Sequence, residues 1–303
     1  MAYDVLVVGG GIAGLTAALY TCRAGKTVLV LEKENPGGQI NWSPCVENYP
    51  GLAHVSGSEI SDRLLAQVLD QGGEVELEEV TGIEDGRVKK IRTASGTVYE
   101  GYSLIAATGA LPRKLNLPEE EKYIGNGECF CALCDGAFYA QAPVAVCGGG
   151  NAALQDALYL SDTCSRVYLI HRRSQFRGEA KLVELLKKKS NVEFVLNSRI
   201  AGLYGEESLE GITVEDAEGG KKALAVDGLF VAIGRVPDNG IFSEILDLDE
   251  SGYIVAGEDC KTSVPGIFAA GDGRRKAVRQ LVTAAGDGAI AATGACRYTD
   301  SLR

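Results

Sequence analysis

The sequence predicts an α/β fold built from two similar units, with the second unit inserted into the first. Three observations indicate this architecture. A module of strand, glycine turn, helix and strand stands at the N-terminus, a second copy of it lies in the middle of the chain, and a late segment resembles the end of the first unit. The length of 303 residues is enough for two domains of ordinary size.

The first unit starts with residues 5–8, a continuous apolar run typical of a strand that is covered on both faces. A helix-like stretch to about residue 24 and a strand over residues 27–31 follow, and Glu32 ends that strand. The turn before the helix consists of Gly9, Gly10, Gly11, Ile12, Ala13 and Gly14. This order is the fingerprint of a Rossmann-like dinucleotide-binding domain, in which a pyrophosphate approaches the helix N-terminus and the acid accepts a hydrogen bond from a ribose. The unit therefore suits FAD.

The same module returns with a strand over residues 144–147, a turn that begins at Gly148, a helix over 154–161 and a strand over 166–170. The turn residues expected to bind a nucleotide are Gly149, Gly150, Asn151 and Ala152. Where the first unit has an acid, the second has a basic cluster of His171, Arg172, Arg173 and Arg177. Guanidinium groups bind a 2′-phosphate that a carboxylate would repel, so NADPH is expected in preference to NADH. The alternative interpretation is an exposed run of charge on a helix.

Each unit closes with a similar strand, over residues 104–109 in the first and 230–235 in the second. The residues expected to reach the nucleotides from these strands are Thr108, Gly109, Ile233 and Gly234. Because residues 266–272 return late, the FAD-binding domain is expected to be discontinuous, over residues 1–114 and 241–303. The NADPH-binding domain is expected over residues 115–240 and carries the redox cysteines.

Three of the nine cysteines form a cluster, Cys129, Cys131 and Cys134, with Asp135 directly after it. Two cysteines separated by two residues can close a small disulfide or present two thiols, of which the thiolate is reactive. Asp135 is expected to give a proton to a leaving thiolate. The alternatives are inert thiols or a metal site. A zinc site needs four ligands, but the chain has no second pair of this spacing and only two histidines, so no metal is expected.

The overall composition limits the partners and the compartment. A formal net charge of −11 argues against nucleic acid or an anionic membrane surface as a partner. No apolar run reaches the ~18 residues of a membrane span, and the first apolar run is too short for a signal peptide. The other six cysteines are scattered singly, which is typical of a reduced compartment. A cytoplasmic protein is therefore expected.

With these residues in place, the sequence resembles the low-molecular-weight thioredoxin reductases over essentially its whole length. The motifs that carry the resemblance are the first glycine turn, residues 37–39, residues 47–51, residues 107–109, the cysteine pair with Asp135, the second glycine turn, the basic cluster, residues 266–272, and Arg279 with Gln280. The resemblance implies an NADPH-dependent thioredoxin-disulfide reductase that contains FAD. It also implies thioredoxin or a thioredoxin-like protein as the partner, and a homodimer.

The resemblance also implies roles for single residues. Further flavin-binding positions are Gly38, Gln39, Asn48, Val80, Asp272, Arg279 and Gln280. Cys134 is similar to the thiol that faces the flavin, Cys131 to the thiol that attacks the thioredoxin disulfide, and Asp135 to the proton donor. The implied reaction passes a hydride from NADPH to FAD, two electrons to the Cys131–Cys134 disulfide, and then exchange with thioredoxin through a mixed disulfide.

Some positions depart from the family's pattern, and three other functions stay open. Leu133 and Gln155 replace the residues usual in the family, and Cys129 and Cys45 are additional to its pattern.

A flavin-dependent dithiol oxidase would lack a working NADPH site. A ferredoxin-linked reductase would lack either the basic cluster or the cysteine pair, and this sequence has both. A non-catalytic nucleotide sensor would have no use for the cysteine pair.

Overall fold

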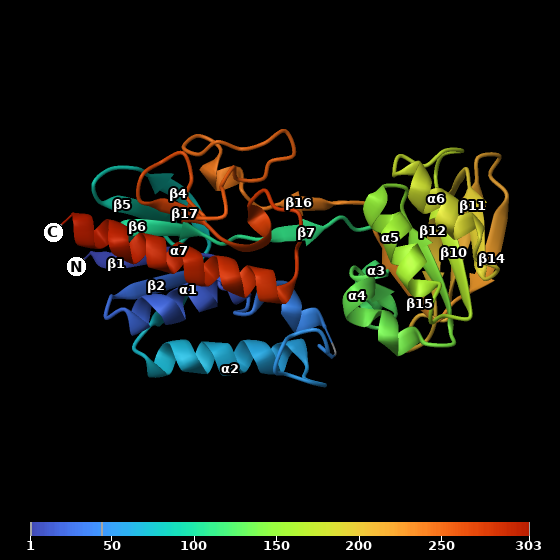
Figure 1. Cartoon of the computed structure of the whole chain (residues 1–303), viewed down its shortest axis with the longest axis horizontal. Helices are drawn as coiled ribbons and strands as arrows, with labels where there is room; N and C mark the ends of the chain where they lie inside the picture. The colour runs from blue at the N-terminus through green and yellow to red at the C-terminus, as the bar shows by residue number, and fades with distance from the viewer. Residues whose placement is uncertain (1, 44, 303) are drawn as a thin grey trace. The chain divides into compact units, whose positions relative to one another are not determined.

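The computed structural model describes residues 2–43 and 45–302 and divides into two compact units (Figure 1). Unit 1 consists of Met1–Pro44, Tyr49–Leu111 and Val236–Arg303, and unit 2 of Cys45–Asn48 and Pro112–Arg235. The two crossings between the units run through β7 (Ala110–Pro112) and β16 (Arg235–Pro237), which pair as a two-stranded sheet. The chain thus leaves unit 1, builds most of unit 2, and returns.

Unit 1 is built on a seven-stranded sheet of order β3-β2-β1-β6-β5-β4, with β17 also paired to β6. Its strands are β1 (Tyr3–Val8), β2 (Val28–Glu32), β3 (Glu74–Leu77), β4 (Val80–Glu84), β5 (Lys89–Thr93), β6 (Val98–Ala106) and β17 (Ile267–Ala269). The first half of β6 pairs antiparallel with β5, and its second half pairs parallel with β17. The late segment therefore joins the sheet of the first unit, as the sequence predicts.

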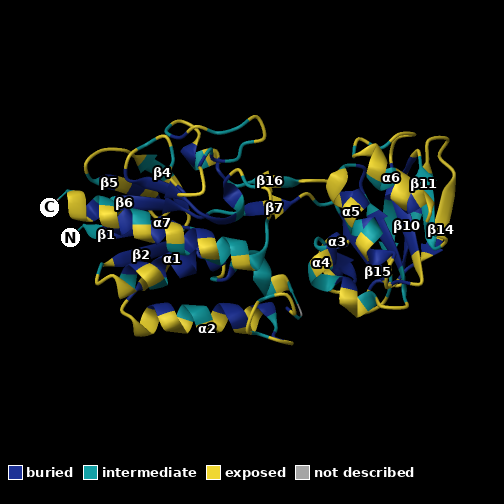
Figure 2. Ribbon diagram, in the orientation of Figure 1, coloured by how far each residue is buried: buried dark blue, intermediate teal, exposed yellow. Residues whose placement is uncertain are grey.

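The faces of this sheet are covered by different parts of the chain. Helices α1 (Ile12–Arg23) and α7 (Leu281–Ser301) pack on one face, and α2 (Gly57–Asp70) packs against α1. Buried residues between 242 and 256, including Phe242 and Leu246, cover the other face. All five residues of β2 are buried, including Glu32 at its end, as expected for a strand that is covered on both faces (Figure 2).

Unit 2 has three layers. A five-stranded parallel sheet of order β11-β10-β9-β15-β8 lies between helices and an antiparallel sheet of order β12-β13-β14. Its strands are β8 (Glu128–Cys129), β9 (Pro143–Cys147), β10 (Arg166–His171), β11 (Val192–Leu196), β12 (Ser198–Tyr204), β13 (Gly211–Asp216), β14 (Lys221–Ala225) and β15 (Gly228–Val231). Its helices are α3 (Glu120–Tyr123), α4 (Ala132–Asp135), α5 (Asn151–Leu160) and α6 (Ala180–Lys187). The mixed α/β fold with two dinucleotide-binding units is the predicted one.

Both closing strands end earlier than the sequence pattern predicts. The strand β6 ends at Ala106 and β15 ends at Val231. Gly109 has a φ of +73° and Gly234 a φ of +115°. Such backbone angles do not continue a strand, so the last residues of each run turn away from the sheet. Residues 2–43 and 45–302 also include four short 3-10 segments: η1 (Gly38–Trp42), η2 (Gly136–Tyr139), η3 (Gly240–Phe242) and η4 (Gly271–Gly273).

A further run of basic residues, Arg274-Arg275-Lys276, lies in unit 1. Arg274 is buried and the side chain of Lys276 is only 6% exposed, and both pair with Asp287 of α7, at 2.8 Å and 2.7 Å. The Asp287 carboxylate also accepts a hydrogen bond from the backbone of Gly271 at 3.0 Å. This buried cluster fixes α7 to η4. Among the described residues, no helix has the length and apolar character needed to cross a membrane.

Candidate active site

The first glycine turn is tightly packed on the side that faces the sheet. Gly9 has a φ of +102°, and a Cβ on it would lie 2.4 Å from the carbonyl oxygen of Ala107. A Cβ on Gly14 would lie 1.9 Å from the carbonyl oxygen of Gly9. On the other side, a Cβ on Gly11 would meet only the Gly37 carbonyl oxygen within 4 Å, at 3.8 Å. The turn is closed toward the protein and open at the start of α1, where Ile12 and Ala13 are buried.

Glu32 ends β2 with its carboxylate beside this turn. Its Oε2 atom accepts a hydrogen bond from the Gly10 backbone at 2.6 Å, and Oε1 accepts one from Glu34 at 2.9 Å. The residue is 8% exposed. The structure therefore brings the acid at the end of the second strand to the glycine turn, as the fingerprint requires.

The segment after β2 folds back onto the open side of the turn. A Cβ on Gly38 would lie 3.4 Å from the Cα of Gly11, and one on Gly109 would lie 3.9 Å from Nε2 of Gln39. The same Nε2 atom donates a hydrogen bond to the carbonyl oxygen of Ala110 at 2.9 Å. Gly38, Gln39 and Gly109 are thus brought together around the start of α1.

Asn239 connects the end of β6 to two later segments. Its Oδ1 atom accepts a hydrogen bond from Oγ1 of Thr108 at 2.8 Å. Its Nδ2 atom donates to the carbonyl oxygens of Gly252 and Gly273, at 2.9 Å and 2.7 Å. Sequence reasoning missed this buried residue, because an asparagine that joins distant segments leaves no local pattern.

The predicted flavin-binding residues of the late segment lie around the start of α7. Asp272 is in η4, and Nε of Arg279 donates a hydrogen bond to its carbonyl oxygen at 3.4 Å. The Arg279 guanidinium also lies over the ring of Tyr253, 4.3 Å from its centroid. Gln280 is the N-cap of α7 and forms a capping box with Thr283.

Two other predicted flavin-binding residues, Val80 and Asn48, do not lie among the residues around the start of α1 or α7. Val80 begins β4, and its side chain is buried in the core of unit 1. Asn48 belongs to Cys45–Asn48, which groups with unit 2 and not with the other predicted flavin-binding residues. The roles of both residues stay predictions.

The residues of unit 1 fit a bound flavin nucleotide. Helix α1 has Gly11 as its N-cap and no side-chain hydrogen bond at that cap, so the N–H groups of its first turn are available to a pyrophosphate. Glu32 supplies a fixed acceptor for a ribose hydroxyl. A Cβ at Gly9 or Gly14 would break the close packing of the turn, which explains why glycine stands at both positions.

The second glycine turn, in unit 2, has the same design. Gly148 has a φ of +157°, and a Cβ on it would lie 2.5 Å from the carbonyl oxygen of Ala232. Gly150 is the N-cap of α5, has no side-chain hydrogen bond, and would have nothing within 4 Å of an added Cβ. Asn151 begins the helix and exchanges hydrogen bonds with Glu179, at 2.7 Å and 3.0 Å. The turn is therefore also open at the helix N-terminus, beside the exposed Ala152.

The basic cluster after β10 divides into two kinds of residue. His171 is 6% exposed, and its Nε2 lies 3.1 Å from the carbonyl oxygen of Gln175. Burial lowers the pKa of His171, so its imidazole is a neutral support. Arg172, Arg173 and Arg177 are exposed. The structure thus separates His171 from the guanidinium groups that can meet a phosphate.

The backbone of this cluster folds back to the glycine turn. The N–H of Arg177 donates to the carbonyl oxygen of Gly149 at 2.7 Å, and that of Gly178 donates to it at 3.1 Å. Ile233 follows the end of β15 and is 37% exposed. The carbonyl oxygen of the next residue, Gly234, accepts a hydrogen bond from the backbone N–H of Arg113 at 3.0 Å. The segment after β10 therefore lies beside the turn that follows β9.

The redox cysteines lie at the carboxyl end of the parallel sheet of unit 2. Cys131 and Cys134 are joined by a disulfide, and both are partly exposed. Helix α4 spans the pair, and the backbone N–H groups of Cys134 and Asp135 donate to the Cys131 carbonyl oxygen at 3.1 Å and 3.0 Å. Leu133, between them, is 55% exposed. The predicted disulfide is therefore present, next to solvent.

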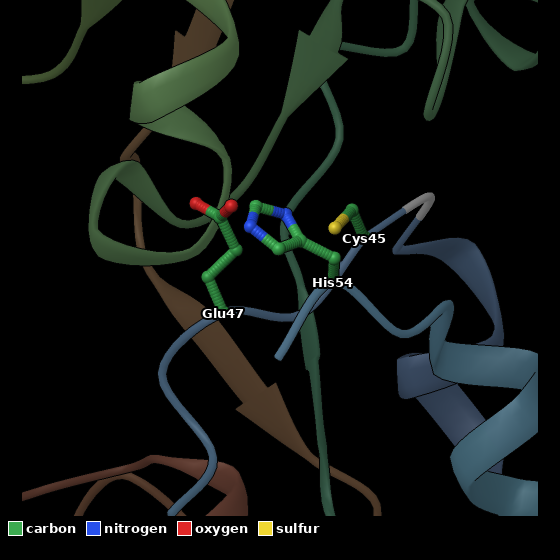
Figure 3. Close-up of side chains that lie close together, drawn as sticks. All are labelled: Cys45, Glu47 and His54. Atoms are coloured by element: carbon green, nitrogen blue, oxygen red, sulfur yellow. The ribbon is translucent and has the colours of Figure 1, made fainter. Parts of the chain in front are cut away.

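Among the described residues, one group of three potential metal ligands lies close together. The donor atoms of Cys45, Glu47 and His54 lie within 4.8 Å of one another (Figure 3). They supply three of the four ligands that a structural zinc site needs. Because Cys45 and Glu47 belong to unit 2 and His54 to unit 1, this grouping does not define a site.

Known proteins match the chain over nearly its full length. Residues 3–288 match the family described as pyridine nucleotide-disulphide oxidoreductase. The chain is 39% identical over 303 residues to the thioredoxin reductase of Listeria monocytogenes, with 99% of this chain and 95% of the relative covered. It is 40% identical over 304 residues to the thioredoxin reductase of Treponema pallidum, with 99% and 98% covered. The crystal structure of thioredoxin reductase from Streptococcus pyogenes matches with a TM-score of 0.93 at 37% identity, with 99% of both chains covered.

The chain belongs to the pyridine nucleotide-disulphide oxidoreductase family, as the two nucleotide-binding units, the redox disulfide and these matches show. Proteins of this family use a flavin and a pyridine nucleotide. Within that class it groups with the low-molecular-weight thioredoxin reductases, which it matches from end to end.

Proposed function

We propose that the chain is a thioredoxin-disulfide reductase that takes electrons from NADPH, holds FAD in unit 1, and exchanges its Cys131–Cys134 disulfide with thioredoxin. The observation that carries the proposal is the disulfide itself. It follows β8 directly, at the same edge of the parallel sheet as the open glycine turn after β9. Ligands of open α/β sheets bind at this carboxyl edge.

The residues of unit 2 have separate tasks in this reaction. The N-terminus of α5 binds the pyrophosphate of the nucleotide, and Arg172, Arg173 and Arg177 bind the 2′-phosphate. This assignment makes NADPH the preferred donor. Residues 115–240 then form the NADPH-binding domain, with Ile233 and Gly234 at the nicotinamide end. The bound flavin supplies two-electron transfer between the nicotinamide and the disulfide.

The residues of unit 1 hold the flavin nucleotide. The N-terminus of α1 binds its pyrophosphate, and Glu32 accepts a hydrogen bond from its ribose. The further contacts come from Gly38, Gln39, Asn48, Val80, Thr108, Gly109, Asp272, Arg279 and Gln280. Residues 1–114 and 241–303 form this FAD-binding domain.

The reduced cysteine pair then performs thiol–disulfide exchange. The Cys131 thiolate attacks the thioredoxin disulfide and forms a mixed disulfide, and one thioredoxin sulfur leaves as a thiolate. Asp135 gives its proton to that leaving thiolate. Cys134 attacks Cys131 in turn, which releases reduced thioredoxin and restores the disulfide. The protein acts in the cytoplasm as a homodimer, in line with its composition and its family.

The test is anaerobic. The purified protein is mixed with NADPH or NADH, flavin bleaching is followed by absorbance, and thiol release is measured after thioredoxin is added. NADPH is expected to bleach the flavin faster than NADH at equal concentration. Cys134→Ser is expected to abolish thioredoxin reduction and to retain flavin bleaching. Bleaching by NADH alone, or full thioredoxin reduction by the variant, contradicts the proposal.

A further inference from the structure

Asn239 joins two stretches of unit 1 that follow neighbouring strands. Thr108 lies just after β6, and Gly273 lies after β17, which pairs parallel with β6. Asn239 is 1% exposed. Its side chain accepts a hydrogen bond from Oγ1 of Thr108 at 2.8 Å and donates one to the carbonyl oxygen of Gly273 at 2.7 Å. One buried amide group therefore connects the segments that leave two adjacent strands.

The rest of the hydrogen-bonding capacity of this amide is also used. Nδ2 of Asn239 donates to the carbonyl oxygen of Gly252 as well, at 2.9 Å. The position thus needs one acceptor and two donors in a short side chain, and asparagine supplies them. Because a buried carbonyl that loses its donor is costly, these three partners hold the amide in one orientation.

Gly109 and Gly273 pack closely beside this amide. A Cβ on Gly273 would lie 3.1 Å from Oδ1 of Asn239, 3.2 Å from the Gly109 carbonyl oxygen and 3.3 Å from the Gly109 nitrogen. The Gly109 carbonyl oxygen also accepts a hydrogen bond from the backbone N–H of Asp238 at 3.3 Å. The backbone after β6 and the backbone of η4 therefore have little room to move independently.

The segments that Asn239 connects carry residues predicted to bind the flavin. β1, β6 and β17 are parallel where they pair. The start of α1 after β1, Gly109 after β6 and Asp272 after β17 therefore lie at the same carboxyl edge of the sheet. Ligands of open α/β sheets bind at this edge. Since Asn239 is itself buried, it acts on a ligand through the two segments that it holds.

We propose that Asn239 is a positioning residue of the flavin site: its amide fixes residues 108–109 against η4, so that Gly109 and Asp272 keep the spacing that a flavin nucleotide requires. The inference rests on the proposed function, which assigns FAD to unit 1. It also changes the task of Thr108, because the hydroxyl proton of Thr108 is donated to Asn239 and not to the flavin.

The test is the dissociation constant of FAD, measured by ultrafiltration of the full-length protein over a series of FAD concentrations. Asn239→Ala leaves two buried carbonyl oxygens without their donor and is expected to raise this constant at least about tenfold. The matched control is Ser103→Ala, which removes another buried hydrogen bond, from Oγ within β6 to the Gly266 carbonyl oxygen at 2.7 Å. It is expected to lower the stability in urea but to change the FAD constant less than about twofold, because separate sites act independently.

A double substitution tests whether the effect passes through Thr108. Thr108→Val keeps the shape of the side chain without its hydroxyl and is expected to raise the FAD constant about threefold or more. Thr108→Ser keeps the hydroxyl and is expected to bind FAD as the parent does. Asn239→Ala and Thr108→Val together are expected to raise the constant no further than Asn239→Ala alone, since both remove the same hydrogen bond.

The outcomes separate the two possible failures. If the parent protein binds no FAD, the proposed function is wrong and the inference falls with it. If the parent binds FAD and Asn239→Ala binds it as tightly, or Ser103→Ala weakens binding as much, the inference is overturned. Effects of the two substitutions that multiply overturn it as well, because Thr108 would then contact the flavin directly. Should Asn239→Ala fail to fold, Asn239→Ser takes its place, with an expected rise of about threefold or more, and an unchanged constant counts against the inference.

Discussion

The imidazole of His171 lies directly against the backbone of Gly149. A Cβ on this glycine would be 2.1 Å from Cε1 of the ring. The ring is also stacked on Phe176, with centroids 5.2 Å apart. The residue at the end of β10 therefore sets the shape of the turn at the end of β9, and an exposed arginine could not take its place.

Gly149→Ala is expected to destabilise unit 2, because the added methyl group would overlap the His171 ring. Overpacking of this kind costs about 1–3 kcal/mol, measured as the change in the free energy of unfolding in urea. The matched control is Gly150→Ala, since nothing lies within 4 Å of a Cβ there. Equal destabilisation by the two substitutions would contradict the contact between His171 and Gly149.

The double substitution of Arg172 and Arg173 by alanine is expected to raise the KM for NADPH at least about tenfold, since it removes charge-assisted hydrogen bonds to the 2′-phosphate. The KM for NADH is expected to change little. Arg166→Ala is the control, because Arg166 is an exposed arginine at the opposite end of β10. A parallel loss with both nucleotides would assign the two arginines a structural role instead.

Asp287→Asn is expected to destabilise unit 1 by about 3–5 kcal/mol, because it leaves two buried cations without their counter-charge. Burial alone would raise the pKa of Asp287, but the hydrogen bonds and charges of Arg274 and Lys276 together hold it below its usual value. This contribution to stability is thus present above pH 4 or so and is lost as the pH falls through the lowered pKa. Urea unfolding of both forms measures the difference, and Glu184→Gln, at an exposed ion pair, is expected to cost under about 1 kcal/mol. A similar small effect at Asp287 would refute the importance of the buried cluster.

Glu128→Gln is expected to stabilise unit 2 increasingly as the pH rises. Burial, and then the charge of Glu120, raise the pKa of Glu128 from 4.5 to about 9. The protonated Glu128 side chain therefore makes its full contribution to folding stability below pH 4.5. This contribution is lost as the pH rises toward 9, because Glu128 in the unfolded chain releases its proton at a lower pH than Glu128 in the folded chain. The difference in unfolding free energy between variant and parent is measured at pH 6 and pH 9. Exposed Glu207→Gln serves as the control, and a pH-independent difference for Glu128→Gln would show that this carboxyl group does not titrate abnormally.

The modules that repeat in the chain could be predicted because their physics is local. A glycine turn between a buried strand and a helix is readable wherever it occurs, and both turns in this chain lie where the pattern indicates. The disulfide of Cys131 and Cys134 is local as well, since the two residues are three positions apart. Where the expected strands 104–109 and 230–235 run too long, the reason is the positive φ of Gly109 and Gly234, which an apolar run does not reveal.

Contacts over long sequence distances could not be predicted in this way. Asn239 bonds to Thr108 across 131 residues, and Asp287 neutralises two cations that the sequence presents as a basic run. Nor does a run of His and Arg residues reveal that His171 is buried and neutral while its neighbours face solvent.

The sequence by itself determined the two nucleotide-binding modules, the cysteine pair and the family, because each depends on residues a few positions apart whose backbone requirements are specific. Only the tertiary structure decided which polar side chains are buried and what they contact, among them the Cys129 thiol beside the Tyr139 hydroxyl and the Asp287 carboxylate beside two cations. Burial and contact depend on how distant segments pack, and packing sets whether a thiol or an imidazole is charged or neutral.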